Sequence, residues 1–209
     1  MVLVVAAVAA AGCVGEEDAP ASAPTPTTAP VSAEAPGDVS KKILMVIAPE
    51  NFRDEELFEP KKIFEDNGVI VTIASTSTDT AKGMLGATVK PDMALADVNM
   101  SEYDAIVIIG GAGSKDYLWE NMELRRMVKD AYARNRVVSA ICISPVVLAR
   151  AGVLEGKRCT VFPDPECVDE LKEHGAAYVN RDVVVSDNVI TGRDPKSAKS
   201  FARAVLDAI

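Results

Sequence analysis

Short runs of apolar residues alternate along most of this chain with segments in which apolar and polar residues have helical spacing. The apolar runs contain almost no polar residue, which is typical of strands that are buried on both faces. The main runs are residues 43–48, 69–74, 105–109 and 137–141, followed by a shorter one at 159–161. They predict buried strands that pair in parallel.

The segments between these runs repeat apolar residues every three or four positions, as one face of an amphipathic helix does. The predicted helices cover residues 54–67, 118–135, 146–151, 165–174 and 195–208. Pro60 lies inside the first of them, so it either bends that helix or moves its start further on. Strands that alternate with helices predict an α/β fold with a doubly wound, mostly parallel sheet and helices on both faces.

Three segments have weaker signals. Residues 87–89 are a candidate short strand, and residues 91–97 are expected to form a loop. Residues 183–186 and 189–191 predict a hairpin, because Asp187-Asn188 is a typical turn between two β-prone runs.

The first 41 residues do not follow this alternation, so we expect three parts in the chain. Residues 1–13 form a leader, residues 14–41 a linker, and residues 42–209 a single globular domain. The linker is rich in Pro, Ala and Thr and has no aromatic residue, so it cannot bury enough apolar surface to fold. It predicts a disordered tether.

The leader ends in Ala10-Ala11-Gly12-Cys13, which resembles the cleavage site of lipoprotein signal peptides. In those peptides the cysteine becomes a lipid anchor, so Cys13 predicts an exported domain held at a membrane. No Lys or Arg precedes the apolar run, which departs from a signal peptide. The alternative is an Ala-rich leader without such a role and a cytoplasmic protein.

The composition of the chain limits the kinds of molecule that it is expected to bind. The chain has 209 residues and a net charge of -9, which argues against a nucleic-acid-binding surface. Its single histidine, His174, is expected at the end of a helix, where a cation suits the helix dipole. One histidine and scattered cysteines do not make a zinc site, so we expect no metal and no cofactor. Cys159 and Cys167 either pair in an oxidising compartment or serve as small core residues.

Ligands of parallel sheets bind beyond the carboxyl ends of the strands. This rule places three segments at one edge: residues 49–56, the Gly110-Gly111 loop, and the turn at Cys142. They are far apart in the sequence, and only the topology brings them together.

Cys142 has the most chemical promise of these residues. It follows an apolar strand directly, and Pro145 then opens a helix, so the cysteine is expected on a sharp strand-to-helix corner. A helix N-terminus favours negative charge, which predicts a solvent-presented thiolate. Backbone N–H groups of the Gly110-Gly111 loop and of Ile143 would then form an oxyanion hole. The alternatives are a buried structural cysteine and a plain glycine turn.

The acidic residues Asp54, Glu55, Glu56 and Glu59 stand at the start of a predicted helix, where acids are favourable for helix stability alone. One carboxylate facing the same edge would nevertheless share a proton with the cysteine. A protonated carboxyl group that donates to the sulfur would hold the cysteine as a thiolate.

The order of these motifs resembles the ThiJ/PfpI superfamily, which includes intracellular-protease-like proteins and a parkinsonism-associated deglycase. The resemblance covers about residues 43–209 and rests on the helix start before Pro60, on Ile108-Ile109-Gly110-Gly111 and on Ala140-Ile141-Cys142. It implies a flavodoxin-like fold shared with class I glutamine amidotransferases, and a homodimer or higher homo-oligomer. By motif position it implies that Cys142 is the nucleophile, that Glu56 is its hydrogen-bonding glutamate, and that Gly111 and Ile143 form the oxyanion hole.

The chain departs from that pattern at the positions where relatives carry histidine. Ile143 follows the cysteine, where protease-like members have histidine, and Phe162 occupies the position of a histidine found in other members. Ile109 replaces the proline before the glycine pair. No Cys–His pair can therefore form at this edge within one chain.

The resemblance implies a cysteine-dependent hydrolase, or a glyoxalase or deglycase, that acts on a small carbonyl compound or a peptide. The hypothesis of a peptidase is weakened most, because this chain lacks the histidines that protease-like members carry at the site. One alternative is a non-enzymatic protein of oxidative stress, a redox sensor or chaperone-like protein that uses the same cysteine. Another is a binding domain that keeps the pocket without turnover.

Overall fold

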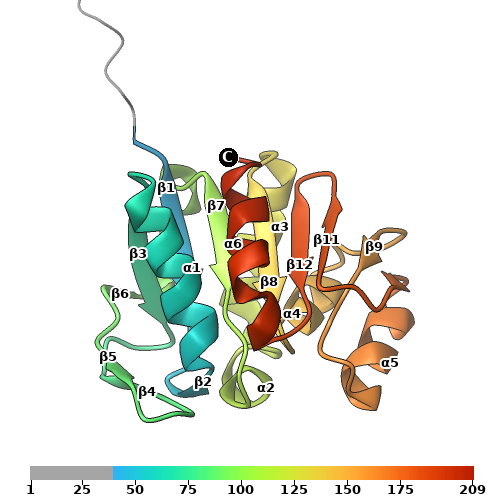
Figure 1. Ribbon diagram of the computed structural model, residues 1–209, viewed down its shortest axis with the longest axis horizontal. Coiled ribbons are helices and arrows are strands. Elements are labelled where there is room, and N and C mark those ends of the chain that lie inside the picture. Colours follow the sequence, from blue (N-terminus) through green and yellow to red (C-terminus); the bar gives the residue numbers. More distant parts are fainter. Residues whose placement is uncertain (1–39) are drawn as a thin grey trace, which may run out of the picture. The chain divides into compact units, whose positions relative to one another are not determined.

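Residues 40–209 are described by a computed structural model, and they form an α/β fold around one large sheet (Figure 1). The sheet strands are β1 (Lys42–Val46), β3 (Ile70–Ser75), β6 (Met93–Ala94), β7 (Ala105–Ile108), β8 (Val137–Ile141), β11 (Val183–Ser186) and β12 (Val189–Gly192). Their spatial order is β11-β12-β8-β7-β1-β3-β6. Only the β11–β12 hairpin is antiparallel, so the predicted doubly wound, mostly parallel sheet is confirmed.

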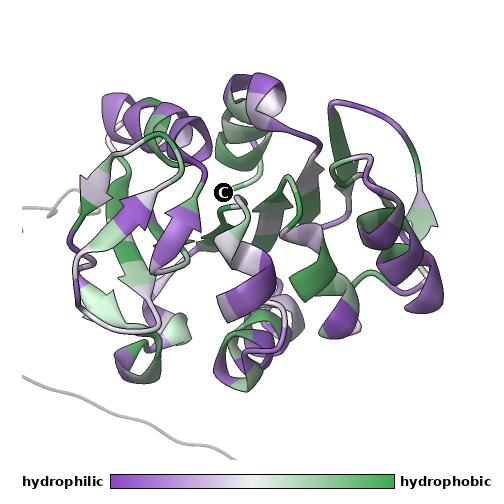
Figure 2. Ribbon diagram, turned by 90° about the horizontal axis from the view of Figure 1, so that it is seen from below, coloured by the Kyte–Doolittle hydropathy of each residue, from purple (hydrophilic) through white to green (hydrophobic). Residues whose placement is uncertain are grey.

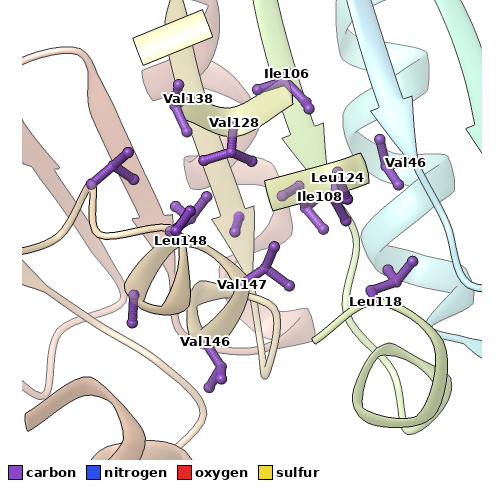
Figure 3. Packing of buried hydrophobic residues seen from close by; sticks show 14 of the residues in the cluster. Val46, Ile106, Ile108, Leu118, Leu124, Val128, Val138, Val146, Val147 and Leu148 are labelled. Carbon is purple, nitrogen blue, oxygen red and sulfur yellow. The ribbon is translucent and has the colours of Figure 1, made fainter. Parts of the chain in front are cut away.

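Helices cover both faces of this sheet. The helices are α1 (Asp54–Asp66), α2 (Gly113–Tyr117), α3 (Met122–Ala133), α4 (Pro145–Arg150), α5 (Pro165–Glu173) and α6 (Ala198–Leu206). Helices α1 and α6 lie in front of the sheet in Figure 1, while α3 and α4 pack on the opposite face. Figure 3 shows this second face, where Leu124 and Val128 of α3 and Val147 of α4 meet side chains of β7 and β8.

The all-apolar strands follow directly from this arrangement. Successive side chains of a strand point to opposite faces. In β1, Leu44 and Val46 join the core under α3 and α4, whereas Ile43 and Met45 join the core under α1 and α6. Every position therefore needs an apolar side chain, and Figure 2 shows hydrophobic strands enclosed by helices with hydrophilic outer sides.

Short elements complete the described chain. A three-stranded sheet contains β2 (Glu50–Phe52), β4 (Ala81–Gly83) and β5 (Thr88–Val89), and a two-stranded sheet contains β9 (Arg158–Cys159) and β10 (Ala177–Tyr178). The 3-10 turns are η1 (Leu95–Asp97), η2 (Met100–Glu102) and η3 (Pro195–Ser197).

Several predicted boundaries need correction. The helix predicted over 118–135 begins only at Met122, because the Asn121 side chain accepts a hydrogen bond from the Leu124 N–H at 2.9 Å and caps it there. The expected loop over 91–97 contains β6 and η1. The final helix predicted from residue 195 starts as η3 and becomes α-helical at Ala198.

Pro60 neither ends nor delays the first helix, since α1 runs from Asp54 to Asp66 with this proline inside. Proline lacks the N–H that would bond to the carbonyl four residues earlier, which here belongs to Glu56. The missing bond thus falls at the turn that carries the candidate site glutamate.

The cysteine alternatives are settled for the described residues. Cys142, Cys159 and Cys167 are all free and buried, so Cys159 and Cys167 are core residues and the disulfide does not form. Cys13, the predicted leader and residues 14–39 of the predicted linker lie outside the described residues, and their roles stay predictions. Within residues 40–209, none of the helices combines the length and apolar character of a membrane span.

Candidate active site

The three segments expected at one edge meet at the carboxyl ends of β1, β7 and β8, which are neighbours in the sheet. This edge lies at the bottom of Figure 1 and faces the viewer in Figure 2. The N–H of Arg53 donates to the carbonyl of Gly110 at 3.0 Å, which ties the loop after β1 to the loop after β7. The N–H of Cys142 donates to the carbonyl of Gly192 at 3.0 Å and fixes the end of β8 against β12.

Cys142 occupies the predicted corner between β8 and α4. Its φ angle is +63°, a left-handed backbone conformation that residues other than glycine rarely adopt. Such strain persists only where surrounding contacts hold it. Here the carbonyl of Cys142 accepts a bond from the Phe162 N–H at 2.8 Å, in addition to the bond at its own N–H. The sharp turn therefore aims the side chain at the loop after β7.

Gly110 and Gly111 leave the space into which the cysteine points. A Cβ atom on Gly110 would lie 2.5 Å from the Cβ of Cys142 and 2.7 Å from Oε2 of Glu56. Gly111 has a φ of +99°, and a Cβ there would lie 2.4 Å from the backbone nitrogen of Arg53. Both positions therefore exclude a side chain, which lets the glutamate and the cysteine come together.

Glu56 is completely buried at the first turn of α1. Its Oε2 accepts a hydrogen bond from the Gly110 N–H at 3.0 Å, and the carboxyl group also interacts with the Cys142 thiol. Oε1 has no hydrogen-bond partner of good geometry among the described residues. Burial raises the pKa of Glu56 to about 8, against the opposing effects of Cys142, Gly110 and Arg53. The carboxyl group is therefore mostly protonated at neutral pH.

The state of Cys142 differs from the sequence-based expectation of a solvent-presented thiolate. The residue is only 8% exposed, and burial raises the pKa of its thiol, as does the charge of Glu56 when that group is ionised. N–H groups of Gly111 and Ile143 donate toward the sulfur and lower the pKa, but by less than burial raises it. Helix α4 has only six residues, so its dipole adds little to offset the burial. Burial therefore favours the neutral thiol over the thiolate at this position.

The predicted site residues thus come together in the described structure. Glu56, Gly111 and Ile143 all contact Cys142.

Two buried serines, which sequence reasoning missed, support the corner. Ser144 Oγ donates to the carbonyl of Ile109 at 2.7 Å and lies 2.7 Å from Ser114 Oγ. Both serines are fully buried, so these bonds have no competition from water. The only signal in the sequence is the Ser-Pro pair at a helix start, which is too common to assign this role.

A hydrogen bond to its carbonyl group also holds Ile143 in place. The Trp119 indole N–H donates to the carbonyl of Ile143 at 3.1 Å. The carbonyl of Ile143 is thus anchored by Trp119, while the N–H of Ile143, which belongs to the preceding peptide group, faces the Cys142 sulfur. Trp119 itself is buried between α2 and α3 and lies under the cations of Lys115 and Arg150.

No histidine approaches the thiol. His174 lies at the C-terminal end of α5, where its Nδ1 is 2.9 Å from the carbonyl of Glu170, as a structural role predicts. Phe162 is 40% exposed and hydrogen-bonded through its backbone to Cys142. Within residues 40–209, no group of three or more His, Cys, Asp and Glu side chains is placed to hold a metal ion.

Two surface hollows meet at Phe162. One has a volume of about 290 Å³ and reaches Ile143, and we call it the apolar hollow; its apolar lining consists of Ala112, Trp119, Ile143, Phe162 and Cys167. The other has a volume of about 470 Å³, and we call it the charged hollow; its lining consists of Arg53, Glu55, Phe162, Asp194, Pro195 and Lys196. Cys142 lines neither hollow.

Comparisons with known proteins agree with this architecture. An uncharacterized protein of Methanocaldococcus jannaschii is 55% identical over 168 residues, 80% of this chain and 82% of that protein. A glutathione-independent glyoxalase of Caenorhabditis elegans is 31% identical over 169 residues, 81% of this chain and 89% of that protein. Relatives named deglycases, including one from Escherichia coli, are 30%, 32% and 33% identical.

A crystal structure of a ThiJ/PfpI domain protein from Brachyspira murdochii superimposes with a TM-score of 0.77 at 34% identity, covering 81% of this chain and 96% of that one. The family model that matches residues 41–208 is the DJ-1/PfpI family. The match spans the sheet, its helices and the Cys142 edge. The chain therefore belongs to the DJ-1/PfpI family.

Proposed function

We propose that this protein is an enzyme of the glyoxalase or deglycase type that converts small reactive carbonyl compounds, and that Cys142 and Glu56 carry the reaction. The observation that carries the proposal is the contact between a thiol on a strained corner and a fully buried carboxyl group with a raised pKa. Relatives named as a glyoxalase and as deglycases support the class of reaction.

The first step is addition of the sulfur to an aldehyde. With a pKa of about 8, Glu56 is ionised in roughly a tenth of the molecules at pH 7. In that form the carboxylate takes the thiol proton while Sγ bonds to the carbonyl carbon. Negative charge develops on the carbonyl oxygen, where the N–H groups of Gly111 and Ile143 stabilise it. Glu56 then returns the proton to this oxygen and leaves a neutral hemithioacetal.

For a 2-oxoaldehyde, the same carboxylate can complete the conversion. Glu56 removes the proton from C1 of the hemithioacetal and returns it to C2, while the C1 hydroxyl loses its proton and the C2 oxygen gains one. C1 is thereby oxidised to a thioester and C2 is reduced to an alcohol. Water then hydrolyses the thioester and releases a 2-hydroxy acid and the thiol. The net reaction adds one water to the substrate and needs no external oxidant or reductant.

Burial favours small substrates over peptides. Cys142 is only 8% exposed, which leaves little of the residue for an extended chain to reach. The redox role expected for an exposed, low-pKa thiolate loses support for the same reason, because the pKa of this buried thiol is raised.

The test uses the full-length chain with methylglyoxal and measures formation of the 2-hydroxy acid. We expect turnover that is lost in Cys142→Ala and falls at least a hundredfold in Glu56→Gln, while both variants keep the far-UV circular dichroism of the parent. Turnover that persists in Cys142→Ala would refute the proposal, and so would a parent protein with no turnover.

A further inference from the structure

We infer that the apolar hollow holds the substituent of the carbonyl substrate, and that the enzyme prefers 2-oxoaldehydes with a neutral alkyl substituent over those with a small or anionic one. This inference rests on the proposed function. Its basis is that one residue, Ile143, both lines the hollow and directs its N–H toward the Cys142 sulfur. A carbonyl oxygen held by that N–H would have its substituent next to the hollow.

The interior of the hollow favours an apolar group. Ala112, Trp119, Ile143, Phe162 and Cys167 supply its apolar lining. Trp119 and Cys167 are buried, so they form a fixed floor, while Phe162 is partly exposed at the side shared with the charged hollow. A volume of about 290 Å³ exceeds that of an alkyl chain of several carbons. Methylglyoxal, with a single methyl substituent, would leave most of it empty.

The charged side chains around the hollow disfavour an anion. Lys115 supplies the only cation among its lining residues, and its Nζ is 2.7 Å from Oε1 of Glu166. Asp164 adds a second carboxylate, whose Oδ1 accepts a bond from the Glu166 N–H at 3.0 Å. One cation against two carboxylates leaves a net negative charge. A substituent that ends in a carboxylate would therefore meet repulsion, whereas an alkyl group would not.

The charged hollow provides the contrast on the other side of Phe162. Its Arg53 forms an ion pair with Glu55 at 2.8 Å, and Asp194 accepts a bond from the Lys196 N–H at 2.9 Å. Four of its six lining residues are charged, against three of eight in the apolar hollow, so an alkyl chain would lie closer to ionic groups there. The two hollows therefore make opposite predictions about which variant alters the preference for alkyl chains.

The experiment measures kcat/KM of the full-length protein for straight-chain 2-oxoaldehydes with methyl, propyl and pentyl substituents, and for one with a terminal carboxylate. Burial of each methylene in an apolar site predicts a gain of about two- to fourfold. We therefore expect the pentyl compound to exceed the methyl compound by at least tenfold, and the carboxylate compound to fall below the pentyl compound by at least tenfold.

Matched variants locate the substituent. Ala112 is exposed and lines the apolar hollow, so Ala112→Leu should narrow the hollow and lower the ratio of kcat/KM for the pentyl compound to that for the methyl compound. Ala112→Ser should keep the gain, and so should Lys196→Leu, which changes the charged hollow instead.

The outcomes separate this inference from the proposed function. Methylglyoxal turnover without a gain along the alkyl series overturns the inference alone. A gain that Lys196→Leu removes and Ala112→Leu does not also overturns it, because the substituent would then occupy the charged hollow. Absence of turnover with every compound, methylglyoxal included, refutes the proposed function itself.

Discussion

Glu56 and Cys142 face each other across the space that Gly110 leaves by having no side chain. The glutamate comes from α1 and the cysteine from the end of β8, and the Gly110 N–H donates to the carboxyl group between them. Because both groups are buried, a negative charge on one disfavours a charge on the other. The pair thus acts as one titrating unit, and its properties can be measured separately from any substrate.

Alkylation of Cys142 by iodoacetamide should show this unit directly. We expect its rate to rise with pH through an inflection near 8, since ionised Glu56 can accept the thiol proton as the sulfur reacts. Glu56→Gln should abolish that inflection. Glu59→Gln, one helical turn away and paired with Lys199 on the surface, should retain it. An identical profile in the parent and in Glu56→Gln would contradict the coupling.

Global stability should depend on the same carboxyl group. The pKa of Glu56 is raised from 4.5 to about 8 in the folded protein, so between these values the folded state binds a proton that the unfolded state releases. Stability from this group is complete below pH 4.5 and declines as pH rises from 4.5 through 8, by on the order of 5 kcal/mol.

Urea denaturation between pH 5 and 8.5 measures this effect. As the pH rises across that range, the parent should lose unfolding free energy relative to Glu56→Gln, because the neutral glutamine does not ionise. A difference that stays constant with pH would show that Glu56 is not perturbed by folding.

Gly110→Ala tests whether the space between the two groups is required. The added methyl group would lie 2.5 Å from Cβ of Cys142, so the corner or the carboxyl group must move. We expect at least a hundredfold lower methylglyoxal turnover, together with a loss of stability. Gly152→Ala is the matched control, because its Cβ would meet nothing within 4 Å although its φ is +77°. It should cost about 1 kcal/mol of stability and leave turnover unchanged.

The buried serine pair should position the corner. Ser144→Ala leaves the carbonyl of Ile109 and the hydroxyl of Ser114 without their partner, which should cost about 1–3 kcal/mol. The double variant with Ser114→Ala should cost clearly less than the sum of the single variants, because both partners are then removed. Strictly additive losses in urea denaturation would show that the two hydroxyl groups are energetically independent.

If Ser144 positions the corner, Ser144→Ala should also lower the rate of the reaction. We expect its kcat for methylglyoxal to fall several-fold with little change in KM, as a shift of the sulfur relative to its N–H donors would produce. Ser139→Ala, which removes another buried hydroxyl bond to the sheet but lies away from the corner, should lower stability without that change in kcat.

The sequence was sufficient for the sheet and for the convergence of the three site segments. Strands such as β7 and β8 have apolar side chains at every position because cores lie on both faces, and this pattern is visible without a structure. Parallel pairing then forces their carboxyl ends to one edge. The corner at Cys142 was likewise predictable, because Pro145 marks the start of α4 immediately after the strand.

The burial of the sulfur could not be predicted in the same way. It depends on how Glu56, the Gly110-Gly111 loop and Phe162 pack around residue 142, and these groups come from three separate loops or helix starts. Helix position alone suggested a lowered pKa, but desolvation outweighs a six-residue helix. Short strands such as β2 and β4 were missed because two or three residues carry no periodic signal.

The backbone bond from the Phe162 N–H to the Cys142 carbonyl does not depend on which side chain residue 162 carries. The backbone at Phe162 can therefore keep its bond to Cys142 when the side chain at position 162 is replaced. The side chain near the sulfur can thus change without a change in the backbone that holds the corner. One substitution, Phe162→His, would place an imidazole on this existing framework without disturbing the backbone bond to Cys142.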